Sequence, residues 1–159
     1  MSTQFTAAPV RTQVVVQAPV QRAFDVFTQD MMSWWPADHH LLEGELAEMV
    51  LEPRVGGRIY DRNVDGRECT WARVLAYDPP DRIVFSWDIT PQWQLETNPD
   101  RTSQVEVRFV AESDSRTRVE LEHRALERHG EGWERLSEVV ASPGGWPKTL
   151  DAYAGRLAA

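Results

Sequence analysis

Cysteine and lysine are almost absent from this chain, and it has no long apolar run. The single cysteine, Cys69, excludes an internal disulfide and a zinc site built from several cysteines. No segment approaches the roughly 20 consecutive apolar residues that cross a bilayer. The segment from Met1 to Val10 lacks the basic and apolar parts of a secretory signal. We therefore expect a cytoplasmic protein with no membrane partner.

Basic residues are too few for a surface that binds nucleic acid. The 17 Lys and Arg residues, among which Lys148 is the only lysine, are outnumbered by 25 Asp and Glu residues, and the net charge is −8. Contacts to phosphates need clustered Lys and Arg, whereas the arginines here are interspersed with acidic residues. The sequence therefore predicts no nucleic-acid partner, and solubility explains the charge.

Motifs that would mark a catalytic or cofactor site are also missing. The sequence has no Gly-x-Ser-x-Gly elbow, phosphate-binding loop, dinucleotide fingerprint or His-Glu-x-x-His helix. Because His39 and His40 are adjacent, their side chains tend to point apart in an extended segment and do not easily share one metal ion. His129 lies in a loop before the last helix, where we expect it to be solvated. We predict no cofactor and no metal site, and we favour a protein without catalytic activity over an enzyme.

The pattern along the chain predicts one strand, two short helices, six strands and a long C-terminal helix. A β-branched run at 13–17 predicts the first strand, and Pro19 then opens a helix at a position where its missing N–H costs nothing. A second short helix ends before Pro36, and the C-terminal helix is interrupted at 142–145. Alternating apolar and polar residues predict the other strands at 47–51, 58–63, 68–77, 83–88, 105–109 and 119–123.

This order of elements indicates an α+β fold. A twisted antiparallel sheet covered on one side by helices buries the apolar faces of both. We therefore predict a curved six- to seven-stranded antiparallel sheet wrapped around the C-terminal helix, with two short helices after the first strand. Residues 13–159 form this single domain, after a flexible N-terminal tail at residues 1–12. The apolar face of the last helix contains Trp146, Leu150, Tyr153 and Leu157.

Several motifs are similar to those of one known superfamily. They are Pro19 to Phe27, Trp34-Trp35-Pro36, Leu51-Glu52-Pro53-Arg54, Gly56-Gly57-Arg58, Asp78-Pro79-Pro80, Ser86-Trp87, Leu121-Glu122-His123, and Gly145-Trp146 with Leu150 and Tyr153. On these residues the chain resembles the START-like (SRPBCC, helix-grip) superfamily and, within it, the family of Hsp90 ATPase activator homologues (AHSA1-like domains). The resemblance spans about Gln13 to Leu157. It implies a helix-grip fold with a cavity between the sheet and the long helix.

The tryptophan-rich covered face of the sheet is the main candidate for a functional site. Ligand pockets are mostly apolar with a few convergent polar groups, and aromatic rings offer rigid area to a flat guest. The same side chains could instead be plain core packing, and the sequence does not decide between the two. The candidate ligand-binding residues are Trp34, Trp35, His39, Tyr60, Trp71, Phe85, Trp87, Trp93, His123, Trp146 and Leu150.

Two polar residues near this face have alternative interpretations. His123 could bind a guest or act as a general base, or it could be a core histidine satisfied by a backbone carbonyl. Arg73 has the parity of Trp71, so both could face the cavity, where Arg73 would anchor a ligand carboxylate. Alternatively both face solvent, while Ala72 and Val74 face inward.

Our leading hypothesis is a non-catalytic domain that binds a small hydrophobic or aromatic molecule between the sheet and the C-terminal helix. The break at Ser142 to Gly145 offers a route of entry, since Pro and Gly interrupt the helix and its halves could part. One alternative is an enzyme of the cyclase or hydrolase type, with His123 as a weak catalytic candidate. Another is a co-chaperone-like protein-interaction module. Two copies could form a homodimer through a sheet edge or the loop Thr90 to Asp100.

Overall fold

The computed structural model describes residues 8–36 and 39–158. Its strands are β1 (Val10–Val16), β2 (Leu46–Leu51), β3 (Arg58–Asn63), β4 (Glu68–Asp78), β5 (Arg82–Trp87), β6 (Ser103–Ser113) and β7 (Arg116–Arg124). Its α-helices are α1 (Val20–Gln29), α2 (Trp133–Ala141) and α3 (Trp146–Ala158). Its short 3-10 helices are η1 (Met31–Ser33), η2 (Pro99–Arg101) and η3 (Leu126–His129).

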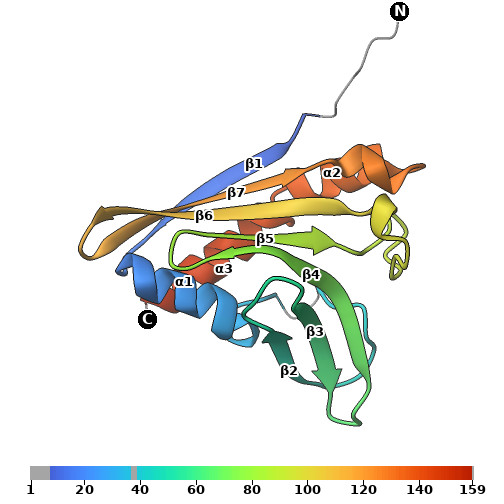
Figure 1. Cartoon of the computed structure of the whole chain (residues 1–159), viewed down its shortest axis with the longest axis horizontal. Coiled ribbons are helices and arrows are strands. Elements are labelled where there is room, and N and C mark those ends of the chain that lie inside the picture. The colour runs from blue at the N-terminus through green and yellow to red at the C-terminus, as the bar shows by residue number, and fades with distance from the viewer. Residues whose placement is uncertain (1–7, 37–38, 159) are drawn as a thin grey trace, which may run out of the picture.

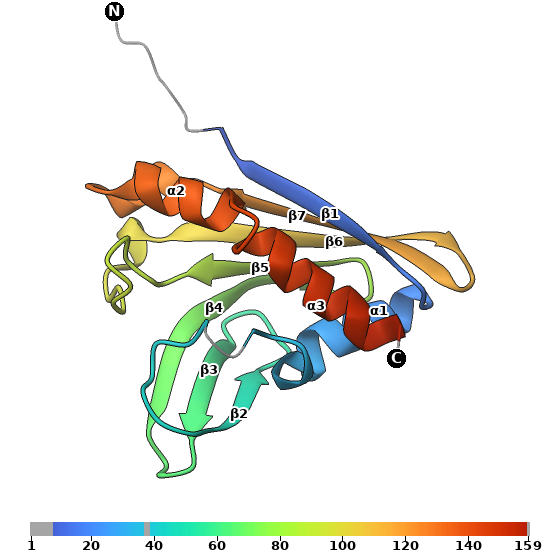
Figure 2. The ribbon, with the colours of Figure 1, turned by 180° about the vertical axis from the view of Figure 1, so that it is seen from behind.

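All seven strands belong to one antiparallel sheet with the order β1-β7-β6-β5-β4-β3-β2. Consecutive strands from β2 to β7 are neighbours, and β1 pairs with β7 at the far edge (Figure 1). Seen from behind, α3 crosses one face of the curved sheet, and α2 lies beyond the start of α3 (Figure 2). The predicted helix-grip fold is therefore confirmed. Within the described residues, no helix is both long and apolar enough to span a bilayer.

The alternation of side chains along β7 places an apolar surface against the helices. Val119, Leu121 and His123 are buried, whereas Glu120 and Glu122 on the opposite face are partly exposed. The same period of two governs strands in general, because successive side chains point to opposite faces. The covered face predicted from this pattern is therefore confirmed.

The first strand begins earlier than predicted. Val10 pairs with His123 and Thr12 pairs with Leu121, so the last part of the expected tail at 1–12 belongs to β1. Pairing with β7 satisfies the backbone hydrogen-bonding groups of this segment. The short segment has no alternation of apolar and polar residues from which this pairing could be predicted. Residues 1–7 of the expected tail lie outside the described residues.

A β-bulge in β4 resolves the two alternatives for Trp71 and Arg73. Ile59 of β3 lies opposite Ala72, and the register then shifts so that Trp71 is an extra residue. A bulge breaks the strict alternation, and both Trp71 and Ala72 are buried as a result. Arg73 lies on the other face, where its Nε and Nη2 donate to Asp88 at 3.1 Å each. Ala72 and Val74 face inward and Arg73 faces away from the core, as the second alternative predicted. The shared face of Trp71 and Arg73, which both alternatives assumed, is wrong, and so is the anchor role of Arg73 that rested on it.

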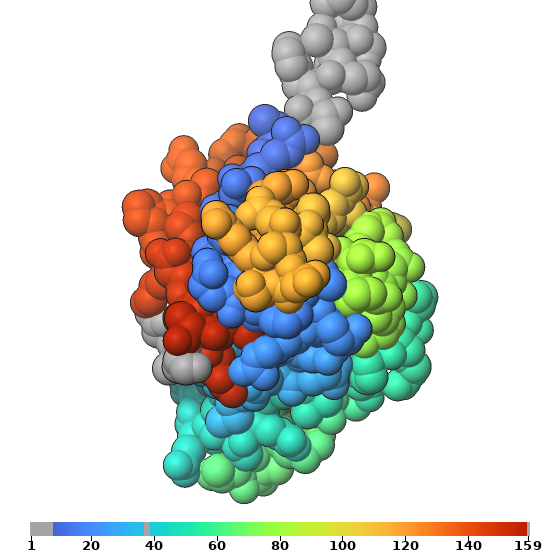
Figure 3. All heavy atoms as spheres, turned by 90° about the vertical axis from the view of Figure 1, so that its left-hand side faces the viewer, coloured from blue at the N-terminus to red at the C-terminus, as the bar shows by residue number. Residues whose placement is uncertain are grey.

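Helices α1 and α3 meet at the end of the sheet where the chain finishes. The hydroxyl of Tyr153 on α3 donates to the backbone carbonyl of Ala23 on α1 at 2.6 Å. Its ring packs edge-on against Phe27 and at a steep angle against Trp34. Figure 3 shows the surface of α1 (blue) beside the end of α3 (red). This contact anchors the second half of the C-terminal helix.

The predicted break in the C-terminal helix is confirmed, because α2 ends at Ala141 and α3 begins at Trp146. Ser142 caps α2 by donating its backbone N–H to the carbonyl of Val139 at 3.2 Å. Gly145 donates its N–H to the carbonyl of Ser142 at 2.9 Å, which closes a tight turn. A Cβ on Gly145 would lie 2.4 Å from the carbonyl oxygen of Val140. Only glycine fits at this position.

Gly145→Ala is therefore expected to lower the free energy of unfolding by about 1–3 kcal/mol, since the new methyl group overpacks the backbone of α2. Gly144→Ala is the matched control, because a Cβ there meets nothing within 4 Å. We expect the control to change stability by less than about 0.5 kcal/mol. Urea unfolding of both variants measures the difference, and equal midpoints would contradict this account of the turn.

An aromatic pocket at the helix break

Four tryptophan side chains form a closed ring of contacts under the helix break. The distances between ring centroids are 5.2 Å for Trp35 and Trp71, 5.8 Å for Trp71 and Trp87, and 5.5 Å for Trp87 and Trp146. Trp35 and Trp146 close the circle at 6.0 Å. We call this set the tryptophan ring. Its tilted and edge-on geometry is the favourable one for aromatic pairs, so the ring is a rigid floor.

An open pocket of about 370 Å³ lies over this floor. Its size falls within the range of roughly 300–1,000 Å³ that small-molecule sites occupy. Trp35, Trp87 and Trp146 line it, and the buried indole N–H of Trp87 has no acceptor among the described residues. Such an unpaired buried donor is unusual. The other lining residues are His39, His40, Leu41, Ile89, Trp93, Val139, Val140, Gly144, Gly145 and Thr149.

The rim of the pocket combines the helix break with the loop that follows β5. Gly144 and Gly145 line one side, so the break that the sequence predicted lies directly at the pocket. Trp93 lines another side, is 48% exposed, and has a backbone φ of 59°. A bulky residue in this left-handed region is an outlier. A hydrogen bond from the N–H of Trp93 to the carbonyl of Thr90 (2.9 Å) holds it there.

One polar pair connects the pocket to the tryptophan ring. His40 lines the pocket, and its Nδ1 lies 2.8 Å from Oδ2 of Asp61 on β3. The other carboxylate oxygen of Asp61 accepts a hydrogen bond from Nε1 of Trp71 at 3.2 Å. The Asp61 side chain is 2% exposed and that of His40 is 11% exposed. The imidazole of His40 is therefore bound, on its Nδ1 side, to a carboxylate inside the protein.

A second chain of polar groups lies deeper. Trp146 donates from Nε1 to Nδ1 of His123 at 3.1 Å. Nε2 of His123 lies 2.7 Å from Oγ of Ser103, which lies 2.7 Å from Nε2 of His129. Because an indole can only donate, His123 carries its proton on Nε2 and donates it to Oγ of Ser103. The hydroxyl of Ser103 then donates to Nε2 of His129. Nδ1 of His129 has no partner among the described residues.

Burial controls the protonation of this chain. It lowers the pKa of His123 to about 3, and the neighbouring His129 adds to the effect. Burial also lowers the pKa of His129, against the opposing pull of Glu96 and Asp88. Both histidines are consequently neutral at pH 7. The prediction that His129 is solvated is wrong, since it is 2% exposed at the end of η3.

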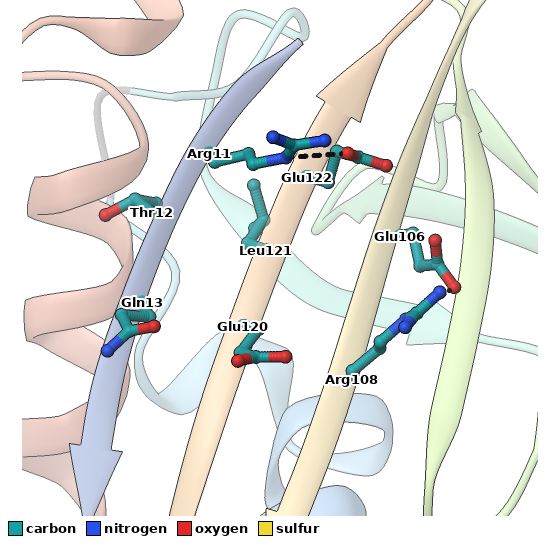
Figure 4. A pocket seen from close by; sticks show the side chains of 8 residues that line it. All are labelled: Arg11, Thr12, Gln13, Glu106, Arg108, Glu120, Leu121 and Glu122. Atoms are coloured by element: carbon teal, nitrogen blue, oxygen red, sulfur yellow. Dashed lines mark hydrogen bonds and ion pairs between the residues drawn. The ribbon is translucent and has the colours of Figure 1, made fainter.

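The opposite face of the sheet carries a hollow of different character. It measures about 460 Å³ and lies over β1, β7 and β6 (Figure 4). Arg11 pairs with Glu122 at 2.9 Å, and Arg108 pairs with Glu106 at 3.0 Å. Burial would raise the pKa of Glu106, but hydrogen bonds from three arginines outweigh it and hold the pKa at about 2. These charges satisfy one another, which leaves the aromatic pocket as the candidate site.

A family model described as "Activator of Hsp90 ATPase homolog 1-like protein" matches residues 17–157. The chain belongs to this family. The match agrees with the resemblance found in the sequence motifs, and it includes the whole pocket. No curated protein matches this member of the family.

Two of the solved structures to which this chain is similar belong to proteins with a named activity or role. One is an "anthrahydroquino-Gama-pyrone synthase", Txn09, complexed with SUM; it is 41% identical, with 94% of this chain and 97% of that chain covered and a TM-score of 0.66. Another is CalC from Micromonospora echinospora, described as a self-sacrificing resistance protein, with 27% identity, coverage of 94% and 93%, and a TM-score of 0.67. Protein NE0264 from Nitrosomonas europaea, at 15% identity and a TM-score of 0.66, shares the fold.

The candidate ligand-binding residues divide into three groups in this family member. Those that line the pocket are Trp35, His39, Trp87, Trp93 and Trp146. Those buried in the core without lining it are Trp34, Trp71, Phe85, His123 and Leu150. Tyr60 lies elsewhere, with the guanidinium of Arg58 stacked 4.4 Å from its ring centre. Five of the eleven candidates thus pack in the core, and the open pocket lies at the helix break.

Sequence reasoning missed the partner of the pocket histidine. Of the two adjacent histidines, the sequence names His39 as the candidate. The structure shows that His40 carries the buried contact, to an aspartate 21 residues away. A signal was present, because Asp61 is an acidic residue at the centre of a strand between Tyr60 and Arg62. A buried carboxylate needs donors, and only the folded chain shows which ones.

Proposed function

We propose that this protein binds a planar polycyclic aromatic molecule over the tryptophan ring and closes a further ring on it. The observation that carries the proposal is an open aromatic pocket in a chain that is 41% identical to an anthrahydroquino-γ-pyrone synthase over nearly its full length. The substrate class is an anthrahydroquinone with a carbonyl-bearing side chain. This replaces the initial hypothesis of binding without catalysis.

The composition of the pocket supports a flat guest. Trp35, Trp87 and Trp146 offer rigid aromatic surfaces that lose little entropy when a ring system packs against them. The apolar side chains of Ile89 and Val140 cover other parts of the wall. The unpaired N–H of Trp87 is buried beneath this wall, so a guest meets the face of its indole ring and not this donor.

A second candidate function is sequestration of the same kind of molecule without turnover. It is favoured by the 27% identity to CalC, whose description is that of a resistance protein. Incubation with an anthrahydroquinone that carries a β-diketone side chain separates the two. Ring closure to a γ-pyrone releases one water, so mass spectrometry of the product detects it. Unchanged substrate, tightly bound, would favour sequestration.

Filling the pocket should weaken binding. Gly144→Trp places an indole in the pocket wall at a site with no atom within 4 Å of the new Cβ. Quenching of tryptophan emission by β-hydroxyanthraquinone measures the affinity of wild type and variant. We expect Kd to rise more than tenfold, which corresponds to about 1.4 kcal/mol.

The matched control is Gly155→Trp, on the exposed side of α3 and likewise free of atoms within 4 Å. It should bind the probe as the wild type does. Equal affinity in all three proteins would place the ligand elsewhere, and absence of quenching in the wild type would refute an anthraquinone-type ligand.

A further inference from the structure

We infer that His40 and Asp61 form the proton-transferring pair of this pocket, with His40 as the general base that ionises a phenolic hydroxyl of the bound aromatic molecule. The inference rests on the proposed function, and it adds the residues and the chemical step. The motivating geometry is a histidine in the pocket wall whose inner nitrogen is held by a buried carboxylate at 2.8 Å.

The hydrogen bonds fix the tautomer of His40. A carboxylate can only accept hydrogen bonds, and Asp61 receives two donors: Trp71 Nε1–H on Oδ1 and His40 Nδ1–H on Oδ2. With its proton on Nδ1, neutral His40 has a free lone pair on Nε2. That nitrogen is the one left for a ligand, because the other edge of the ring is occupied by Asp61. A carboxylate behind a histidine also stabilises the imidazolium that forms when Nε2 takes a proton.

The floor of the pocket keeps the pair in place. Asp61 is 2% exposed, and its second oxygen is bound to a member of the tryptophan ring. Rotation of the carboxylate would therefore cost a buried hydrogen bond. A guest stacked on the ring would lie beside a base whose orientation is already set, which is the preorganisation that proton transfer requires.

The proposed step balances without an oxidant or a second reactant. The phenolic O–H of the substrate gives its proton to Nε2 of His40. An electron pair of the phenolate oxygen forms a C–O bond to a carbonyl carbon of the side chain, and the carbonyl π pair moves to its oxygen. That oxygen takes the proton back from Nε2, giving a cyclic hemiketal. Loss of water from the hemiketal completes the new ring.

His123, the initial candidate for a general base, does not line the pocket. Its Nδ1 accepts from Trp146, and its Nε2 lies against Ser103. Both nitrogens therefore have partners inside the protein. His40 lines the pocket, and its Nε2 has no hydrogen-bond partner among the described residues. The geometry therefore assigns proton transfer to His40.

The test uses the spectrum of bound β-hydroxyanthraquinone, whose phenolate absorbs at longer wavelength than the phenol. It is recorded at a pH where the free probe is mostly neutral. The wild type should hold the probe as phenolate beside the His40 imidazolium. An opposite charge within hydrogen-bond reach shifts a pKa by about 1–3 units. His40→Gln should therefore lower the ratio of bound phenolate to phenol by about 10- to 1,000-fold while leaving Kd within about tenfold.

Asp61→Asn gives an independent readout. The amide oxygen can still accept from Trp71, but the amide N–H₂ now donates to Nδ1, so the proton of His40 moves to Nε2 and the base is lost. The control is Asp65→Asn, in the turn between β3 and β4, where the side chain is 50% exposed. It should retain the wild-type spectrum. Thermal melting checks that each variant is folded.

The outcomes separate this inference from the proposed function. Absence of binding to the wild type would overturn both. Binding with a neutral probe, or a phenolate signal that persists in His40→Gln and Asp61→Asn, would overturn the assignment of the base and leave the aromatic site standing. Restoration of the phenolate band in His40→Gly by added imidazole would support it.

Discussion

Replacing Tyr153 with alanine is expected to lower the free energy of unfolding by about 3–5 kcal/mol. The side chain is completely buried where α3 meets α1, against Phe27 and Trp34. Truncation removes a large aromatic ring from water-excluded surroundings and leaves a cavity that the two helices cannot collapse to fill. Urea denaturation monitored by circular dichroism gives the change directly.

Tyr153→Phe divides this effect into its parts. It keeps the ring and removes only the hydrogen bond to the carbonyl of Ala23. The expected cost is about 0.5–1.5 kcal/mol. Burial raises the pKa of the Tyr153 hydroxyl, so this group is a neutral donor at pH 7. A loss in Tyr153→Ala no larger than in Tyr153→Phe would mean that the helix contact does not depend on packing.

The helices and strands of this fold could be predicted because the sequence patterns that indicate them involve residues close together in the chain. In β7 the apolar residues Val119 and Leu121 alternate with Glu120 and Glu122, and the structure follows the alternation. The break at 142–145 was equally plain, since Pro and Gly end a helix wherever they occur together. These features depend on the neighbours of a residue along the chain, so a single sequence contains them.

The exceptions depend on residues that meet only after folding. Alternation alone gave Trp71 and Arg73 the same face, but the bulge against Ile59 turned Trp71 inward. A bulge is a property of two paired strands, and the sequence of one strand does not show it. His129 was misjudged for the same reason, because its partner Ser103 is 26 residues away.

The candidate site shows the same division. The sequence pointed to an aromatic pocket under the helix, and Trp35, Trp87 and Trp146 do line one. It did not show that the other aromatic side chains would fill most of the space. Whether a tryptophan fills a core or lines a pocket depends on which side chains reach it from other elements. The open pocket lies at the helix break, where Gly144 and Gly145 line it.

Acid should destabilise the protein before its carboxylates titrate, and His123 should be a main cause. Its pKa is about 3 in the folded protein, against an ordinary value of 6.5. Below pH 6.5 this histidine binds a proton in the unfolded chain but not in the folded chain. The contribution of His123 to the free energy of unfolding is therefore fully present above that pH and falls as the pH decreases toward 3. From pH 6.5 to 4.5 the loss from this residue is about 2–3 kcal/mol.

The comparison that isolates His123 is the pH dependence of His123→Gln. Its amide can accept from Trp146 and donate to Ser103, which preserves the pattern of the buried chain. Glu106, whose folded pKa is about 2, loses its contribution only as the pH falls below its ordinary 4.5, so it lies outside this window. His129 remains in the variant, so part of the dependence of unfolding free energy on pH remains as well, because burial lowers the pKa of His129 too. The fall in unfolding free energy from pH 6.5 to pH 4.5 should therefore be smaller in the variant than in the wild type by about 2 kcal/mol. An identical difference in the two proteins would show that His123 is already protonated, or already hydrated, in the folded state.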